Sequence, residues 1–200
     1  MPVGPAAAIE FPCTCESHAG TGRAGAARFP LRAPPGTESL KVWLYNADLV
    51  EQRKFRGLDY YPYDAKAVVT ATFKRNEKPE PVNYLDSREH TGLMYVIGTA
   101  TMTVDGKPLV IKAYTYKSDW KDMEYLLLLF RDGTSGKGTY GGGRVVDVWF
   151  TKGEPPEKIT VNFNMAYAFL CAHSSFYNCP LTLAAKLEAS LPYGEKYPPL

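Results

Sequence analysis

The sequence predicts a mainly β fold, an antiparallel roll or barrel of about seven strands with an N-terminal helix and a short C-terminal helix. In several runs after residue 63, hydrophobic and polar residues alternate with a period of two, which is typical of half-buried strands. No run with helical periodicity separates these strands, so short turns are expected to join them into a meander. The 14 tyrosines among 200 residues also favour strands.

The predicted strands cover residues 68–73, 96–104, 109–114, 123–131, 144–151 and 158–164. The pair Asp105-Gly106 lies between the second and the third of them. An Asp-Gly pair between two strand-like runs is the strongest local signal for a two-residue hairpin turn. We therefore expect these two strands to pair antiparallel.

Three stretches outside the strands carry other patterns. Residues 1–36 are rich in Ala, Gly and Pro and hold few large apolar side chains, which predicts a flexible extension. After Thr37, apolar residues recur at helical spacing, which predicts an amphipathic helix ending near residue 55 or 57. A second, short helix is expected over residues 180–190, with a proline in its first turn. Residues 37–200 are expected to form a single β-rich domain.

Composition argues against several classes of protein. The 23 basic and 21 acidic residues nearly balance, so nothing in the net charge favours a nucleic-acid or membrane partner. The longest apolar run, residues 125–130, is too short to span a bilayer. The N-terminus lacks the pattern of a signal peptide, so a cytoplasmic location is expected. No dinucleotide fingerprint or catalytic-triad order indicates a cofactor or a named reaction.

The most unusual segment is the glycine-rich stretch at residues 130–144. Its Gly136-Lys137 pair does not fit a phosphate-binding loop, because Arg131 stands where a glycine is required and Gly138 stands where Ser or Thr is required. The segment is expected to be a wide hairpin loop between two strands.

Arg131 and Arg144 stand at the two ends of this loop, where antiparallel strands would bring them close. Two guanidinium groups repel unless a negative charge lies between them. Asp132 or Asp147 could supply that charge internally, or a bound anion could supply it with help from the loop. The sequence leaves both alternatives open.

A second group of polar residues stands near the end of the chain. In the run 159–165, Asn162 and Asn164 lie on the polar face of the predicted strand, which either faces water or lines a cavity together with Tyr167. Glu195 could fold back as a counter-ion or a general base. The candidate ligand-binding residues are Arg131, Asp132, Thr134, Ser135, Lys137, Tyr140, Arg144, Asn162, Asn164, Tyr167 and Glu195.

Cys171 and Cys179 flank a short loop, where they could form a disulfide or remain buried thiols. Neither this pair with His173 nor the Cys-x-Cys-x2-His motif of residues 13–18 has a spacing common in zinc sites. We therefore predict no metal site.

Several motifs recur together in one group of proteins; they lie at residues 55–62, 131–144, 162–164, 166–167, 171–172, 179–181 and 194–196. With them the chain resembles an uncharacterised family, the domain of unknown function family 1684, over most of its length after about residue 40. The resemblance implies that the loop, the two later cysteines and Gly194-Glu195-Lys196 are parts of one structural arrangement. It implies no activity. The chain departs from the family at Gly138, where an acid is usual, at His173, where an aromatic residue is usual, and at residues 182–186, where a Pro-rich, Asn-containing stretch is usual.

Three classes of function remain open. The favoured one is a small-molecule binding domain for an anionic or carboxylate ligand. An enzyme, for example a hydrolase, could use the same pocket with Asp132 or Glu195 as acid or base and an arginine stabilising negative charge. In a structural or interaction domain, the arginines would only brace the loop.

Overall fold

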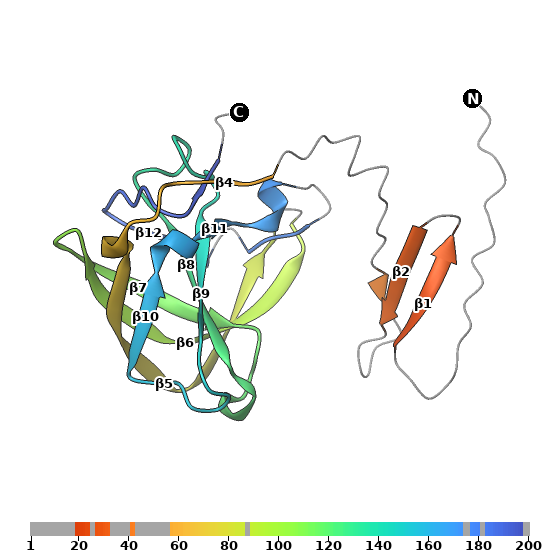
Figure 1. Cartoon of the computed structure of the whole chain (residues 1–200). Helices are drawn as coiled ribbons and strands as arrows, with labels where there is room; N and C mark the ends of the chain where they lie inside the picture. Colours follow the sequence, from red (N-terminus) through yellow and green to blue (C-terminus); the bar gives the residue numbers. More distant parts are fainter. Residues whose placement is uncertain are drawn as a thin grey trace. The chain divides into compact units, whose positions relative to one another are not determined.

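The computed structural model describes residues 19–24, 27–32, 41–42, 57–86, 89–173, 177–180 and 183–197. The chain divides into two compact units, Met1–Gly57 and Leu58–Leu200, which are treated separately (Figure 1). In the first unit, β1 (Ala19–Ala24), β2 (Ala27–Arg32) and β3 (Lys41–Val42) form an antiparallel sheet in that order.

Strand β3 lies inside the segment that was predicted to be the N-terminal helix. Its backbone pairs with Leu31 and Arg32 of β2, so the helix prediction is wrong at Lys41 and Val42. The rest of that segment, up to residue 56, lies outside the described residues. Strands β1 and β2 fall within residues 1–36, whose flexibility and boundary at residue 37 stay predictions.

The second unit is built on an eight-stranded sheet with the order β10-β5-β6-β7-β8-β9-β11, in which β12 pairs with β8. The strands are β5 (Val68–Leu85), β6 (Thr91–Val104), β7 (Lys107–Thr115), β8 (Tyr125–Arg131), β9 (Arg144–Trp149), β10 (Lys158–Asn162), β11 (Tyr167–Ala168) and β12 (Ala185–Lys186). Neighbouring strands are antiparallel, except that β12 runs parallel to β8. The prediction of a mainly β, antiparallel fold is confirmed.

The hairpin of β6 and β7 shows why the alternation predicted this sheet. Val104 pairs with Lys107, and the two turn residues Asp105 and Gly106 have φ angles of 48° and 75°. Two positive φ values in succession match the right-handed twist of the strands, and Asp-Gly tolerates them. The predicted turn is therefore confirmed.

The hydrophobic core uses the alternate positions of these strands. Phe130 at the end of β8 packs edge-on against Phe163, with 5.6 Å between the ring centroids. Ile97, Ile111 and Leu126 are fully buried in the same cluster. Each such side chain contributes about 1.5–3 kcal/mol through burial.

The sheet curls strongly but does not close into a barrel (Figure 1). Strand β10 approaches β9, yet no strand pairing in the described part of the second unit joins β10 to β9 or β11. The Asn162 side chain caps a short 3-10 turn, η3 (Phe163–Met165), and this turn ends β10. The barrel form of the fold prediction is therefore wrong, and the sheet holds one strand more than the number predicted.

The predicted C-terminal helix is also wrong over residues 184–190; Leu183 lies in a 3-10 turn, and residues 181 and 182 lie outside the described part. This stretch forms β12 and an irregular segment with bends at Glu188 and Ala189 instead. Buried and exposed residues alternate along it, and the buried ones are Leu187, Ala189, Leu191 and Tyr193. We call residues 187–197 the tail segment; its last strand, β13 (Glu195–Lys196), pairs antiparallel with β4 (Asp59–Tyr60).

Other helical elements with described bounds are single 3-10 turns, η1 (Ala65–Ala67), η2 (Trp120–Asp122) and η4 (Leu170–Ala172). No helix in the described ranges has the length and apolar character needed to cross a membrane.

Candidate functional site

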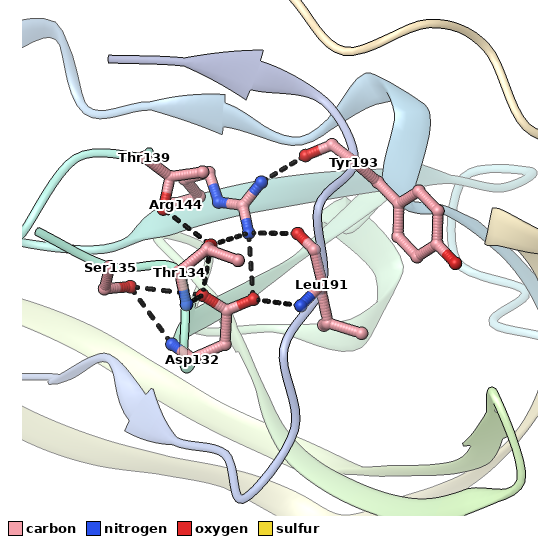
Figure 2. A network of polar contacts seen from close by, with 7 residues as sticks. All are labelled: Asp132, Thr134, Ser135, Thr139, Arg144, Leu191 and Tyr193. Atoms are coloured by element: carbon pink, nitrogen blue, oxygen red, sulfur yellow. Dashed lines mark hydrogen bonds and ion pairs between the residues drawn. The ribbon is translucent and has the colours of Figure 1, made fainter. Parts of the chain in front are cut away.

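A buried ion pair lies where the glycine-rich loop meets the tail segment (Figure 2). Arg144 begins β9 and Asp132 follows β8 directly, and both are buried, with 3.1 Å between Arg144 Nη2 and Asp132 Oδ2. Nη2 also donates to the Leu191 carbonyl oxygen at 2.9 Å, and Nη1 donates to the Tyr193 carbonyl oxygen. The Leu191 amide in turn donates to Asp132 Oδ2 at 2.7 Å. The pair therefore fastens the tail segment to the ends of β8 and β9.

The second carboxylate oxygen of Asp132 organises the loop itself. It accepts hydrogen bonds from the Thr134 amide at 3.1 Å and from the Thr134 hydroxyl at 2.7 Å. The Ser135 hydroxyl lies 3.3 Å away, and the Thr134 and Thr139 hydroxyls are 2.9 Å apart. Thr134 and Ser135 are thus hydrogen-bonded within the loop.

The two arginines of the loop do not share a negative charge. In the antiparallel pairing of β8 and β9, Arg144 lies opposite Phe130, so these two side chains share a face of the sheet. Arg131 is the next residue after Phe130, so its side chain points to the opposite face. Arg131 is exposed, whereas Arg144 is 1% exposed. Burial lowers the pKa of Arg144 and the charge of Asp132 opposes that shift. Of the alternatives left open by the sequence, the internal acid is the one observed for Arg144.

The amides of the glycine-rich loop are also engaged internally. The Gly136 amide donates to the Thr139 carbonyl oxygen, and the Gly138 amide donates to that of Thr134. The Gly133 amide donates to Ala189 in the tail segment. Lys137 is exposed at the tip. An anion nest needs free, convergent amides, and these three are already used.

The candidate site is a pocket of about 510 Å³ beside β13 and β4. Its walls are mostly aromatic and apolar, and its polar groups are few. The lining residues are Leu58, Tyr60, Tyr61, Tyr63, Asn164, Met165, Tyr167, Ala168, Leu170, His173 and Glu195.

The polar centre of this pocket is a pair formed by Glu195 and His173. Glu195 Oε1 lies 2.6 Å from His173 Nε2, and Oε2 accepts the Ala168 amide at 2.9 Å. The Glu195 side chain is 1% exposed and that of His173 is 24% exposed. Because an ionised carboxylate only accepts hydrogen bonds, Nε2 carries a proton, and in the neutral ring Nδ1 is then an acceptor.

Backbone contacts fix the position of Glu195. It is paired with Tyr60 across β13 and β4, and its amide donates to the Ala166 carbonyl oxygen at 2.8 Å. Gly194, just before it, has φ of 74° and packs so tightly that an added Cβ would lie 2.4 Å from that same oxygen. A glycine at this position therefore allows the backbone path that places the Glu195 carboxylate at the pocket.

Two of the four pocket tyrosines have altered acidity. Burial and, secondarily, the charge of Glu195 raise the pKa of Tyr60. The Tyr167 hydroxyl donates to Asp147 at 3.0 Å, and burial raises the pKa of both groups. Both tyrosine side chains are therefore uncharged around neutral pH.

The two asparagines predicted to line a cavity hold the pocket wall together. Asn164 accepts from the Asp64 amide at 2.9 Å and donates to the Asp64 carbonyl oxygen at 2.8 Å, which fixes the segment that carries Tyr63. Asn162 Oδ1 accepts from the Asn164 side chain at 3.0 Å. Asn164 lines the pocket, but its amide is already engaged.

The remaining predicted residues lie beside the pocket. Tyr140 packs against Tyr197, with 5.1 Å between ring centroids, and Tyr197 in turn lies 5.7 Å from the His173 ring. Cys171 and Cys179 are free thiols, and the Cys171 amide donates to Cys179 Sγ at 3.2 Å. Burial raises the pKa of Cys179 to about 12, so this thiol is not a ready nucleophile.

The sequence analysis placed Glu195 among the candidates but missed its partner and most of the pocket. His173 stood out as a departure from the family pattern and beside the two cysteines, but not as a partner of Glu195. Tyr60 and Tyr61 belonged to the motif at residues 55–62 and had no assigned role. That motif and Gly194-Glu195-Lys196 were the available signal, because β4 and β13 bring them together.

Comparison with known proteins gives the chain relatives but no activity. The model of a family described as protein of unknown function (DUF1684) matches residues 53–196, which include every pocket residue. The solution NMR structure of an uncharacterised protein of Haloarcula marismortui is similar at 28% identity with a TM-score of 0.58, over 74% of this chain and 80% of that one. A search of curated proteins finds no match.

Proposed function

The chain belongs to the DUF1684 family of unknown function, and from its site we propose that the domain binds a small organic molecule in the pocket above the His173–Glu195 pair. The observation that carries the proposal is the 1% exposed carboxylate of Glu195 at this pocket. Removing a carboxylate from water costs several kcal/mol even when it is paired. Such groups concentrate in ligand and catalytic sites, where a bound molecule uses the charge.

The size and chemistry of the pocket support the same function. Pockets for small molecules usually enclose about 300–1,000 Å³ and combine apolar walls with a few polar groups. This pocket has about 510 Å³ and tyrosine-rich walls. Its polar groups are positioned by strand pairing and by the Asn164–Asp64 contacts, so the site is preformed.

The ligand predicted from the sequence was anionic, and that prediction rested on the two arginines of the loop. Arg144 donates to Asp132 and the tail segment, and Arg131 does not line the pocket. The bracing role considered for the arginines therefore accounts for Arg144. The binding function rests on Glu195 and His173 instead.

The test is a fragment screen on the isotope-labelled full chain, read by amide chemical shifts. Hits are expected to move the signals of Ala168, His173 and Glu195 in the wild type and to bind at least about 10-fold more weakly to Glu195→Gln, since the charge is lost. Arg131→Gln is the matched control, with unchanged binding. If all hits map to the glycine-rich loop, or if Glu195→Gln binds them equally, the proposal is wrong.

The 2.6 Å contact between His173 and Glu195 also favours a function of another class, acid–base catalysis. A buried carboxylate that orients an imidazole is the arrangement in which histidine serves as general base. Hydrolysis of a panel of aryl esters would detect it as phenolate release. We expect His173→Phe to abolish the release; an equal rate in the variant would exclude this role.

A further inference from the structure

We propose that the pocket selects an organic cation, a molecule with a substituted ammonium group. This inference rests on the binding function proposed above and names the class of ligand. Three independent observations carry it, namely the charges around the pocket, the tyrosine faces and the acceptor nitrogen of His173.

The first observation is the charge balance. Glu195 is the acidic residue among the described lining residues, and none of them is Lys or Arg. The nearest cation along β13 is Lys196, which is paired with Asp59 at 3.3 Å. The charge that the lining itself carries is therefore the negative charge of Glu195, and its burial leaves it little screened by water. The buried guanidinium of Arg144 also interacts with Glu195, but it is already paired with Asp132. An anion would meet repulsion there.

The second observation is the set of tyrosine faces. Tyr60, Tyr61, Tyr63 and Tyr167 line the pocket, and an aromatic face attracts a cation within about 6 Å of its centroid. The structure already contains one such contact, since Lys196 Nζ lies 5.4 Å from the Tyr61 centroid. Several rings beside one buried carboxylate form the arrangement that recognises substituted ammonium groups.

The third observation concerns His173. Its Nε2 lies 2.6 Å from Glu195 Oε1, and in the neutral tautomer that donates this proton to the carboxylate, Nδ1 offers a lone pair. No partner for Nδ1 is found among the residues that the structure places. An ammonium that carries a proton could donate to Nδ1, whereas both oxygens of Glu195 are already engaged and act through their charge.

The test measures the binding of three compounds to the full chain at constant ionic strength. The compounds have similar shapes and differ in charge. Choline carries a trimethylammonium group, 3,3-dimethylbutan-1-ol replaces its nitrogen by carbon, and 3,3-dimethylbutanoate is an anion. We expect choline to bind about 2- to 30-fold more tightly than the alcohol, and the anion to bind most weakly. Amide shifts at Ala168 and His173 report occupancy of the pocket.

Two variants extend the test. Glu195→Gln should remove the preference for choline over the alcohol, because it weakens the binding of choline more than that of the alcohol. Because Glu195 is buried, Tyr63→Leu serves as a second variant at a side chain that is 70% exposed, and it should weaken choline about 2- to 5-fold more than the alcohol. Tyr116→Leu, which is 50% exposed and not part of the pocket, is the matched control with unchanged binding.

The outcomes separate the two proposals. If the alcohol binds as tightly as choline, the cation preference is overturned while the binding function stands. Tightest binding of the anion also overturns it. If none of the three compounds shifts the pocket signals but other fragments do, the ligand class is wrong. If no compound of any kind shifts them, both proposals fail.

Discussion

The Arg144 guanidinium is buried and loses its contacts with water. Contacts with two separate parts of the chain take their place. Asp132 supplies the charge and accepts from Nη2, and the carbonyl oxygens of Leu191 and Tyr193 accept from Nη2 and Nη1. Nε has no hydrogen-bond partner within the described ranges. Removing one member of such a pair leaves the other as an uncompensated buried charge. The side chain therefore matters for stability far more than a surface arginine does.

We expect Arg144→Met to lower the free energy of unfolding by about 3–5 kcal/mol, because Asp132 and two carbonyl groups lose their donor. Arg131→Met, the matched exposed change one residue before Asp132, should cost less than about 0.5 kcal/mol. Urea denaturation of both variants gives the comparison. Equal losses would contradict the bracing role of Arg144.

The sequence indicated one of the two side-chain pairs and not the other, for a physical reason. Asp132 and Arg144 stand at the ends of two neighbouring strands, so their pairing was available as an alternative before the structure. His173 and Glu195 are 22 residues apart in the sequence, and no strand pairing among the described residues joins the segment of His173 to that of Glu195. Their contact depends on how the tail segment returns to β4, and no local pattern encodes that path.

At the scale of elements, alternation predicted β6 and β7 because each alternates buried and exposed residues over much of its length. Strands β8 and β9 are largely buried on both faces, and their apolar runs gave the signal instead. The same alternation is present in Leu187, Ala189, Leu191 and Tyr193, and it was overlooked in favour of a helix over 180–190. A proline in the first turn is permissive for a helix but does not require one. A stretch this short is decided by its partners, here β8 and the Asp132–Arg144 pair.

The close approach at Gly194 gives a test of how β13 is positioned. Gly194→Ala and Gly106→Ala both place a side chain at positive φ, at 74° and 75°, which costs about 1–2 kcal/mol. At Gly106 an added Cβ meets no atom within 4 Å, whereas at Gly194 it would lie 2.4 Å from the Ala166 carbonyl oxygen. Gly194→Ala should therefore cost about 1–3 kcal/mol more.

Chemical denaturation measures this difference between the two variants. Amide shifts should also change at His173 in Gly194→Ala and remain as in the wild type in Gly106→Ala. Indistinguishable stabilities would show that β13 can shift without loss.

At the scale of the second unit, the tail segment completes the core and the pocket together. It contributes buried side chains to the core cluster, the partners of Arg144, and Glu195. Leu187 and Leu191 alone represent about 3–6 kcal/mol of burial, against about 5–15 kcal/mol of stability for a typical domain.

A chain that ends at Lys186 should therefore lose its cooperative unfolding transition and its near-ultraviolet circular dichroism. Glu188→Ala in the full-length chain is the matched control, because Glu188 is an exposed residue of the same segment, and its transition should be unchanged. A truncated chain with the wild-type midpoint would show that the sheet is sufficient without the tail segment.

The dependence of Arg144 on Leu191 has a consequence for synthesis in the cell. The two residues are 47 positions apart, which at about 5–20 residues per second corresponds to a delay of roughly 2–10 s. During that interval the emerging polypeptide presents an unshielded ion pair and uncovered apolar side chains, features to which chaperones respond. Polypeptides released before Leu191 would keep that exposed state and become substrates for degradation, so the second unit matures only after the tail segment has been synthesised.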